Sequence, residues 1–197
     1  MRTGPLLLVT GVMLAWIAVA DLTLIPAQET TAPEAREDKS AETAVERNKA
    51  AVRDFHHQME KGDIQAALVN FADEVENHGR RANKQILRLI LEDIGRTFPD
   101  AKNEIVDIVA EGDNVVARTK VSGTHKGTGT LPVNGGLLVG VPPTGKHYEI
   151  QHIHWFKLRD GKIVAHWANR DDVGMMQQLG LLPTPKRPES LNPPAQK

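Results

Sequence analysis

The stretch from Tyr148 to Asp171, YEIQHIHWFKLRDGKIVAHWANRD, predicts a β-hairpin and decides the fold class. Apolar and polar side chains alternate through its two halves, Tyr148–Leu158 and Ile163–Asp171, as in strands that bury one face. The Asp160-Gly161 pair between the halves is typical of a tight hairpin turn.

Two further strands are expected immediately upstream. Residues 104–110 and 115–124 alternate in the same way, and the Gly112-Asp113 pair marks a turn between them. Before Pro99 the apolar residues recur at three- and four-residue spacing instead, which is typical of helices. We therefore expect helices first and an antiparallel meander afterwards, in an α+β domain whose helices lie on one face of the sheet.

Three helices are expected before the strands. The first ends at Gly62, Asp63 can cap a short second helix, and the third spans 83–98 until Pro99 ends it. A short extended piece at 74–78 separates the second helix from the third. The apolar stripe of the first helix comprises Val45, Val52, Phe55 and Met59.

The two chain ends differ from this domain in composition. Residues 1–20 carry a single charge at Arg2 and close on Ala18-Val19-Ala20, which predicts a secretory signal peptide; the alternative is an uncleaved membrane anchor. Residues 21–43 are expected to form a disordered tether, and residues 182–197, with five prolines, a disordered tail. One domain at 44–181 remains, in a protein that we expect to be periplasmic or secreted.

Composition excludes several kinds of partner and site. The formal net charge of −1 argues against nucleic acid as a partner, and membrane contact is expected only if the N-terminal segment is retained. Without any cysteine, the chain can have no thiol catalysis, disulfide or thiolate metal site. The glycine-rich residues 123–145 lack a phosphate-binding motif and are expected to form a loop over the mouth of a pocket.

Strand parity selects the candidate site residues. In the first half of the hairpin the apolar residues share a face with His152 and His154, and in the second half the same rule places Asn169 and Asp171 inward. An aspartate in an apolar pocket has a raised pKa and suits proton transfer, and histidines beside it could donate to an enolate oxygen. The expected inward faces are Tyr148, Ile150, His152, His154, Phe156 and Leu158, and Ile163, Ala165, Trp167, Asn169 and Asp171.

Each of these polar residues also has a purely structural interpretation. Asp171 is placed to cap the helix expected at 172–179, and an inward histidine is commonly a hydrogen-bonded core residue. The His152-x-His154 spacing would suit a metal ion if His78 or Asp171 supplied a third ligand, but we expect neither metal nor cofactor. The other histidines, His56, His57, His125 and His147, are expected at the surface or at the edge of a helix face.

An ordered set of short motifs between about residues 46 and 183 resembles the SnoaL-like ester cyclases (polyketide cyclases). The strongest match is Asp160–Trp167, followed by Asp171 and the segment from Gly174 to Gly180. The earlier pieces are Ala50–Phe55, Lys61-Gly62-Asp63, Asn77-His78-Gly79, Phe98-Pro99-Asp100, Ala110–Asp113, Val121–Gly127 and Gly140–Lys146.

The resemblance implies a nuclear transport factor 2-like cone, with helices packed in a strongly bent antiparallel sheet, often in a dimer. It also implies a cofactor-free aldol cyclisation in which an aspartate late in the chain removes the proton α to a carbonyl, and by position that residue is Asp171. Two features depart from the family: Ala165 stands where many relatives carry an acidic residue, and residues 128–137 look like an insertion.

Three functions stay open from the sequence. The leading one is an exported, cofactor-free lyase or isomerase that acts on a small hydrophobic carbonyl compound, with Asp171 as general base and a homodimer expected. The alternatives are a non-catalytic protein that binds a small hydrophobic molecule in the same pocket, and a structural dimerisation module. The site would use Asp171, His152 and His154 for catalysis and His78, Asn169, Trp167, Tyr148 and Phe156 for substrate binding.

Overall fold

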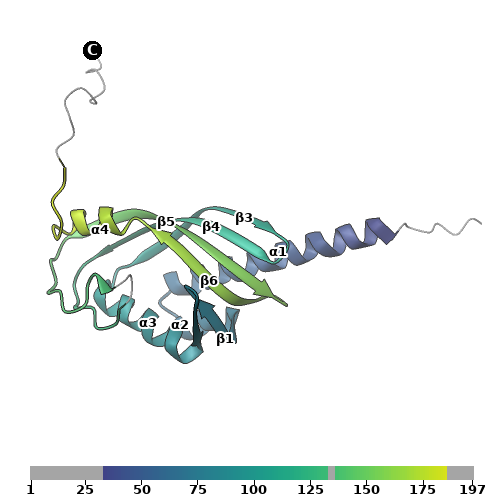
Figure 1. The fold of residues 1–197 in the computed structure, drawn as a ribbon, viewed down its shortest axis with the longest axis horizontal. Helices are drawn as coiled ribbons and strands as arrows, with labels where there is room; N and C mark the ends of the chain where they lie inside the picture. The colour runs from purple at the N-terminus through teal and green to yellow at the C-terminus, as the bar shows by residue number, and fades with distance from the viewer. Residues whose placement is uncertain (1–32, 133–135, 186–197) are drawn as a thin grey trace, which may run out of the picture. The chain divides into compact units, whose positions relative to one another are not determined.

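A curved six-stranded sheet with helices on its concave side forms the domain (Figure 1). The computed structural model describes residues 33–132 and 136–185. Its helices are α1 (Pro33–Glu60), α2 (Ile64–Ala67), the 3-10 turn η1 (Leu68–Asn70), α3 (Lys84–Thr97) and α4 (Asp172–Gln178). Its strands are β1 (Phe71–Asn77), β2 (Arg80–Asn83), β3 (Lys102–Glu111), β4 (Asn114–Thr124), β5 (His147–Arg159) and β6 (Lys162–Arg170). The α+β class expected from the sequence is confirmed.

The sheet has the order β2-β1-β6-β5-β4-β3. Neighbouring strands are antiparallel except β1 and β6, which pair in parallel. The extended piece expected at 74–78 is thus the longer strand β1, which turns at His78 and Gly79 into β2, a strand that the sequence did not predict. This parallel pairing places β1, the first strand of the chain, beside β6, the last.

Helix α1 begins at Pro33, inside the segment for which we expected no regular structure. Proline is favoured at the first position of a helix, and the following residues are rich in Ala, Glu, Lys and Arg, which are strong helix formers. A helix can therefore form here without an apolar stripe. The predicted signal peptide at 1–20 and most of the predicted tail lie outside the described residues. Within those residues, none of the helices has the length and apolar character that a membrane crossing requires.

Strand β5 confirms the parity argument. Tyr148, Ile150, His154, Phe156 and Leu158 are buried, His152 on the same face is half-buried, and the residues of the other face are exposed. The alternation holds because β4 pairs without interruption with residues 147–157, while β6 pairs with residues 152–159.

The parity argument fails in strand β6 because this strand contains a β-bulge. Ile163 pairs with Leu158 and Ala165 pairs with Lys157, so Val164 is an extra residue in the ladder. A bulge of one residue sends every later side chain to the opposite face. The expectation that Trp167 and Asn169 point inward is therefore wrong, and Asp171, which follows the last residue of the strand, is exposed and not buried.

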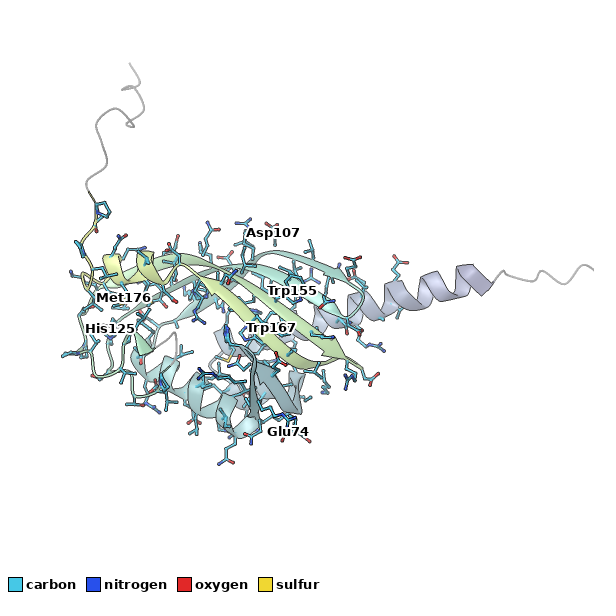
Figure 2. All side chains as sticks on the ribbon, in the orientation of Figure 1. Glu74, Asp107, His125, Trp155, Trp167 and Met176 are labelled. Carbon is cyan, nitrogen blue, oxygen red and sulfur yellow. The ribbon has the colours of Figure 1, made fainter. Side chains whose placement is uncertain are left out.

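Beyond the bulge, the outward residues of β6 pair with outward residues of β5. Trp167 lies opposite Trp155 and Asn169 opposite Ile153, and the two tryptophans are 36% and 50% exposed (labelled in Figure 2). The inward residues are instead His166, Ala168 and Arg170, opposite Phe156, His154 and His152.

Two apolar clusters fill the concave side of the sheet. We call the one near the β5–β6 turn the first core and the one near α4 the second core. The first core comprises Val52, Leu68, Phe71, Val75, Ala82, Leu87, Val115, Ala117, Phe156, Leu158 and Ile163. The second core comprises Phe98, Val121, Leu138, Tyr148, Ile150, Met175, Met176 and Leu179. Strand β5 contributes to both, and its inward-facing residues between them are His152 and His154.

Candidate functional site

A layer of polar side chains separates the first core from the second. It consists of His152 and His154 on β5, Thr119 on β4, His166 and Arg170 on β6, and His56 on α1, and we call it the histidine band. Thr119 and Arg170 both pair with His152 in the sheet, on either side of it. The ring of His56 reaches the band from the helix side, with its centroid 5.7 Å from that of His154.

A chain of hydrogen bonds runs through this band. Asn77 Oδ1 lies 3.0 Å from His166 Nδ1, and His166 Nε2 lies 3.0 Å from His154 Nδ1. The rings of His154 and His166 are nearly parallel, with an interplanar angle of 20°. We call Asn77, His166 and His154 the relay.

Several buried polar atoms of the band have no hydrogen-bonding partner among the described residues. Native interiors satisfy nearly all such atoms, and the exceptions cluster where water, an ion or a ligand binds. Their concentration between two apolar clusters makes the band the candidate site for bound water or for a polar group of a ligand. The atoms are His56 Nδ1 and Nε2, Thr119 Oγ1, His152 Nε2, His154 Nε2 and Arg170 Nε.

The histidines of the band are held neutral by their surroundings. Burial lowers the pKa of His56 to about 4. Burial, reinforced by the charge of Arg170, lowers the pKa of His152 to about 4, although Asp171 opposes the shift. Burial also holds the pKa of His154 well below its ordinary value, with His166 and His56 lowering it further. The pKa of His166 falls to about 3, first through burial and then through His78, His56 and Arg170.

Asp171 stands at the end of β6, where it caps α4. Its Oδ1 accepts a hydrogen bond from the backbone N–H of Gly174 at 2.8 Å, and the side chain is exposed. The capping interpretation is therefore confirmed, while the buried position expected for this carboxylate is not. The carboxylate nonetheless lies close enough to the band to raise the pKa of His152.

A second carboxylate, Asp172, pairs with the cation of the band. Its Oδ1 lies 3.4 Å from Arg170 Nε, and the two side chains are only 27% and 20% exposed. Arg170 thus brings a positive charge to the inner face, with a counter-charge at the edge of the band. An arginine in this position can stabilise an oxyanion.

The remaining predicted site residues are spread over different environments. Tyr148 lies in the second core, where burial and the charges of Asp100 and Asp172 raise the pKa of its hydroxyl, and Phe156 lies in the first core. His78 is exposed but its ring centroid is 5.4 Å from that of His166. Trp167 and Asn169 lie on the outer face, so neither lines the band.

Four members of the band were not predicted from the sequence: His56, Thr119, His166 and Arg170. His56 was expected at the surface, yet it is 2% exposed because it follows Val52 by four residues and so shares its buried face. That spacing could have identified it. His166 and Arg170 are inward only because of the β6 bulge, and no short-range signal revealed the bulge. His125, also expected at the surface, is fully buried beside Phe98 in the second core region.

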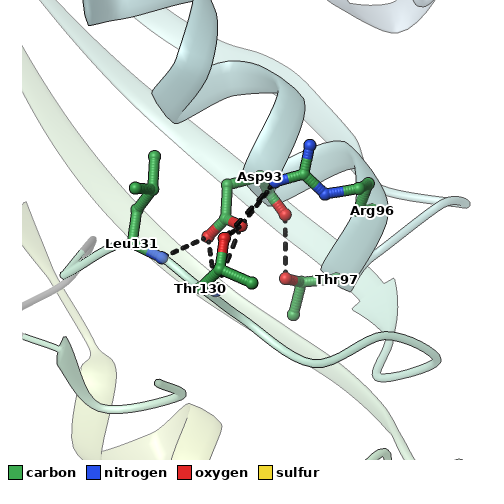
Figure 3. A network of polar contacts seen from close by, with 5 residues as sticks. All are labelled: Asp93, Arg96, Thr97, Thr130 and Leu131. Atoms are coloured by element: carbon green, nitrogen blue, oxygen red, sulfur yellow. Dashed lines mark hydrogen bonds and ion pairs between the residues drawn. The ribbon is translucent and has the colours of Figure 1, made fainter. Parts of the chain in front are cut away.

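The loop between β4 and β5 is fixed to α3 through Asp93 (Figure 3). This carboxylate is 2% exposed and accepts hydrogen bonds from Thr130 Oγ1, the backbone N–H groups of Thr130 and Leu131, and Arg96 Nη2, at 2.6–3.2 Å. Burial alone would raise the pKa of Asp93, but these hydrogen bonds outweigh it and the pKa is lowered. The loop is therefore held to α3 at Thr130 and Leu131, within the segment that we expected to be an insertion.

The cavities found in the described part of the chain lie away from the band. One of about 20 Å³ adjoins the Asp93 anchor, and a surface groove of about 300 Å³ is lined by Glu60, Lys102, Glu104, Lys120, Ser122 and Glu149. Residues 33–132 and 136–185 contain no group of three or more His, Asp or Glu side chains arranged to hold a metal ion.

Comparison with known proteins places these features in a family. Residues 49–179 match the family described as SnoaL-like polyketide cyclase. Nogalonic acid methyl ester cyclase of Streptomyces nogalater is 30% identical over 104 residues, which are 52% of this chain and 71% of that enzyme. Among solved structures, IdmH of Streptomyces antibioticus superimposes with a TM-score of 0.56 and 26% identity, over 68% of this chain and 98% of IdmH.

A SnoaL-like polyketide cyclase of Agrobacterium tumefaciens has the same fold at lower identity. Its TM-score is 0.57 and its identity 19%, over 68% of this chain and 98% of that one. The match to the family spans every strand and α2 to α3, and it ends within one residue of the end of α4.

Proposed function

The chain belongs to the SnoaL-like polyketide cyclase family, and we propose that it is a cofactor-free lyase or isomerase that moves a proton α to a carbonyl of a small hydrophobic compound. Membership supports a cyclase- or isomerase-type function. The observation that carries the finer proposal is the set of partnerless buried polar atoms in the histidine band, bounded on both sides by apolar clusters. Such a site suits a substrate with an apolar body and a few polar atoms.

Asp171 is the general base in this proposal. Its Oδ1 is fixed by the N–H of Gly174, which leaves Oδ2 without a hydrogen bond to any described residue and available to a proton. The proton leaves the α-carbon for Oδ2, and the C–H electron pair becomes an enolate. In a ring closure the enolate carbon attacks a second carbonyl of the same molecule, whose oxygen then takes the proton.

Arg170 stabilises the charge that develops in this step. Its guanidinium lies on the inner face, adjacent in sequence to the base, and its buried Nε makes no hydrogen bond but lies 3.4 Å from Asp172 Oδ1 in an ion pair. A fixed cation in a poorly hydrated site stabilises an enolate more than the neutral ketone. Asp172 keeps the guanidinium in place from the edge of the band.

The test is exchange of α-protons in a small ketone. We would incubate the protein with 2-tetralone in D₂O and follow deuterium incorporation at the α-carbon by NMR, against a protein-free control. Asp171→Asn should reduce the protein-dependent rate about a hundredfold or more, since general-base catalysis contributes on that order. Retention of the full rate in this variant would refute the role of Asp171.

Asp63→Asn is the matched control for this experiment. Asp63 caps α2 through a hydrogen bond from the N–H of Ala66 at 2.9 Å, as Asp171 caps α4, but it lies outside the histidine band. The variant should exchange protons at the wild-type rate. If 2-tetralone binds the wild-type protein but no exchange above background occurs, a non-catalytic ligand-binding protein is favoured instead.

Export and dimerisation belong to this proposal as well. We propose that the N-terminal segment directs export, supported by its apolar run and small-residue ending. We also propose a homodimer, supported by the exposed apolar side chains Ile153, Trp155 and Trp167 on the outer face of β5 and β6. Cell fractionation tests export, and light scattering after gel filtration tests the dimer.

A further inference from the structure

Asn77 determines which atom donates and which accepts in each hydrogen bond of the relay. The carbonyl oxygen Oδ1 of Asn77 can only accept a hydrogen bond, so His166 Nδ1 must carry the proton that it shares with Asn77. A neutral imidazole has one N–H, so the other nitrogen of His166, Nε2, is an acceptor. The proton between the two rings then belongs to His154 Nδ1.

This assignment makes His154 Nε2, the last atom of the relay, a hydrogen-bond acceptor. With its proton on Nδ1, His154 presents a bare lone pair at Nε2. That atom is buried and has no hydrogen-bonding partner among the described residues. Burial and the nearby charge of Arg170 keep both rings neutral, so neither nitrogen gains a second proton at neutral pH.

The surroundings of His154 Nε2 determine which kind of ligand atom can bind there. The ring centroids of His56 and His152 lie 5.7 Å and 5.5 Å from that of His154, and Phe156 stacks on the His154 ring at 5.9 Å. A ligand O–H satisfies the lone pair, whereas a carbonyl or ether oxygen placed there leaves two acceptors facing each other. Leaving a buried acceptor unsatisfied is the basis of strong discrimination between a hydroxyl and its isostere.

We propose that His154 is a specificity-determining acceptor, fixed in its Nδ1–H tautomer by the positioning residues Asn77 and His166, and that the site selects carbonyl compounds that also carry a hydroxyl or enol O–H. This inference rests on the proposed function, since it names the substrate class of the same site. It replaces the sequence-based expectation that His154 donates a hydrogen bond to an enolate.

The tautomer can be observed directly by NMR. In protein labelled with ¹⁵N at histidine, two-bond ¹H–¹⁵N correlations distinguish a protonated ring nitrogen from a bare one. The inference requires that His154 show a protonated Nδ1 and a bare Nε2 at neutral pH. A protonated Nε2 on His154 means that the relay runs in the opposite direction and overturns the inference.

The selectivity is tested with a matched pair of probes, 4-hydroxyacetophenone and its methyl ether, 4-methoxyacetophenone. The wild-type protein should bind the hydroxyl compound about tenfold more tightly or better, as expected for one well-formed hydrogen bond. Equal affinities, preference for the ether, or binding of neither compound would each overturn the selectivity.

Three variants separate positioning from general structural damage. Asn77→Leu removes the acceptor, so His154 should show a mixture of tautomers and the preference for the hydroxyl should disappear. Asn77→Asp keeps an acceptor oxygen beside His166 and should retain both properties. The control Gln151→Leu removes an exposed amide on the outer face of β5 that is bonded to Arg118, and it should change neither.

These readouts do not depend on turnover. If Asp171→Asn retains proton exchange while the tautomer and the hydroxyl preference hold, the proposed mechanism fails and the assignment of the relay stands. If exchange is lost in Asp171→Asn but His154 has a bare Nδ1, only the present inference fails.

Discussion

His154 Nδ1 lies 3.0 Å from His166 Nε2, and the two rings are nearly parallel although they project from different strands. They are not direct partners in the ladder, since His154 lies opposite Ala168 and His166 opposite Phe156. The contact is therefore diagonal, and it exists only because the bulge in β6 turns His166 to the inner face. A one-residue irregularity thus creates the polar layer that divides the two cores.

The buried histidines should make the domain sensitive to acid. His56 has an ordinary pKa of 6.5 that burial lowers to about 4 in the folded state. Below pH 6.5 His56 binds a proton in the unfolded chain but not in the folded one. Its contribution to stability is therefore fully present above pH 6.5 and is lost as the pH falls towards 4. His56→Leu should reduce this loss by roughly 3 kcal/mol, measured by urea unfolding at several pH values.

The neighbouring residue provides the control for that experiment. His57 is exposed on the same helix turn, so His57→Leu should retain the full pH dependence of the wild type. An unchanged pH dependence in His56→Leu would show that burial does not lower the pKa of His56.

Gly174 is required to leave room for the carboxylate of Asp171. A Cβ at position 174 would lie 2.7 Å from Asp171 Cγ, closer than atoms pack, so Gly174→Ala must displace the cap. We expect a loss of about 1 kcal/mol in stability, the usual value of a helix cap, and loss of the protein-dependent proton exchange. Gly95→Ala, in α3 with open space around it, should instead be neutral or stabilising. Equal effects of the two substitutions would contradict this account.

Asp93 should determine how firmly the loop after β4 is held. Asp93→Asn replaces one acceptor oxygen with an amide that faces the N–H donors of Thr130 and Leu131, so we expect a loss of about 1–3 kcal/mol in unfolding free energy. Amide hydrogen exchange at Thr130 and Leu131 should accelerate. Arg96→Gln, which removes only a partly exposed partner, should cost less than about 1 kcal/mol. Slow exchange at both amides in Asp93→Asn would rule out the anchor.

The register of β6 can be tested with single cysteines, because the chain has none of its own. Asn169→Cys places a thiol on the exposed outer face, and Ala168→Cys places one on the inner face opposite His154. A thiol reagent should therefore label the first variant rapidly and the second slowly. The reverse order would restore the strand parity expected from the sequence and remove His166 from the band.

The elements whose signals are local could be predicted from the sequence. Alternation predicted β3 to β6, helical spacing predicted α3, and the family motifs predicted the α+β cone. Within β5 the parity argument also placed His152 and His154 correctly, since an uninterrupted ladder keeps side chains alternating between two faces. The capping role of Asp171 was equally local, because a cap depends only on the three residues that follow it.

The groups that meet His152 and His154 could not be predicted, because they depend on tertiary contacts. The bulge at Val164 depends on how β6 pairs with β5, and β1 pairs with β6 across a long stretch of intervening sequence, so no spacing within the hairpin encodes either one. Asn77, His166 and Arg170 therefore reach the site through strand register, and His56 reaches it through helix packing. The hydrogen-bond direction of the site follows from these long-range pairings, because a proton's position on a neutral histidine is set by the partner on its other nitrogen.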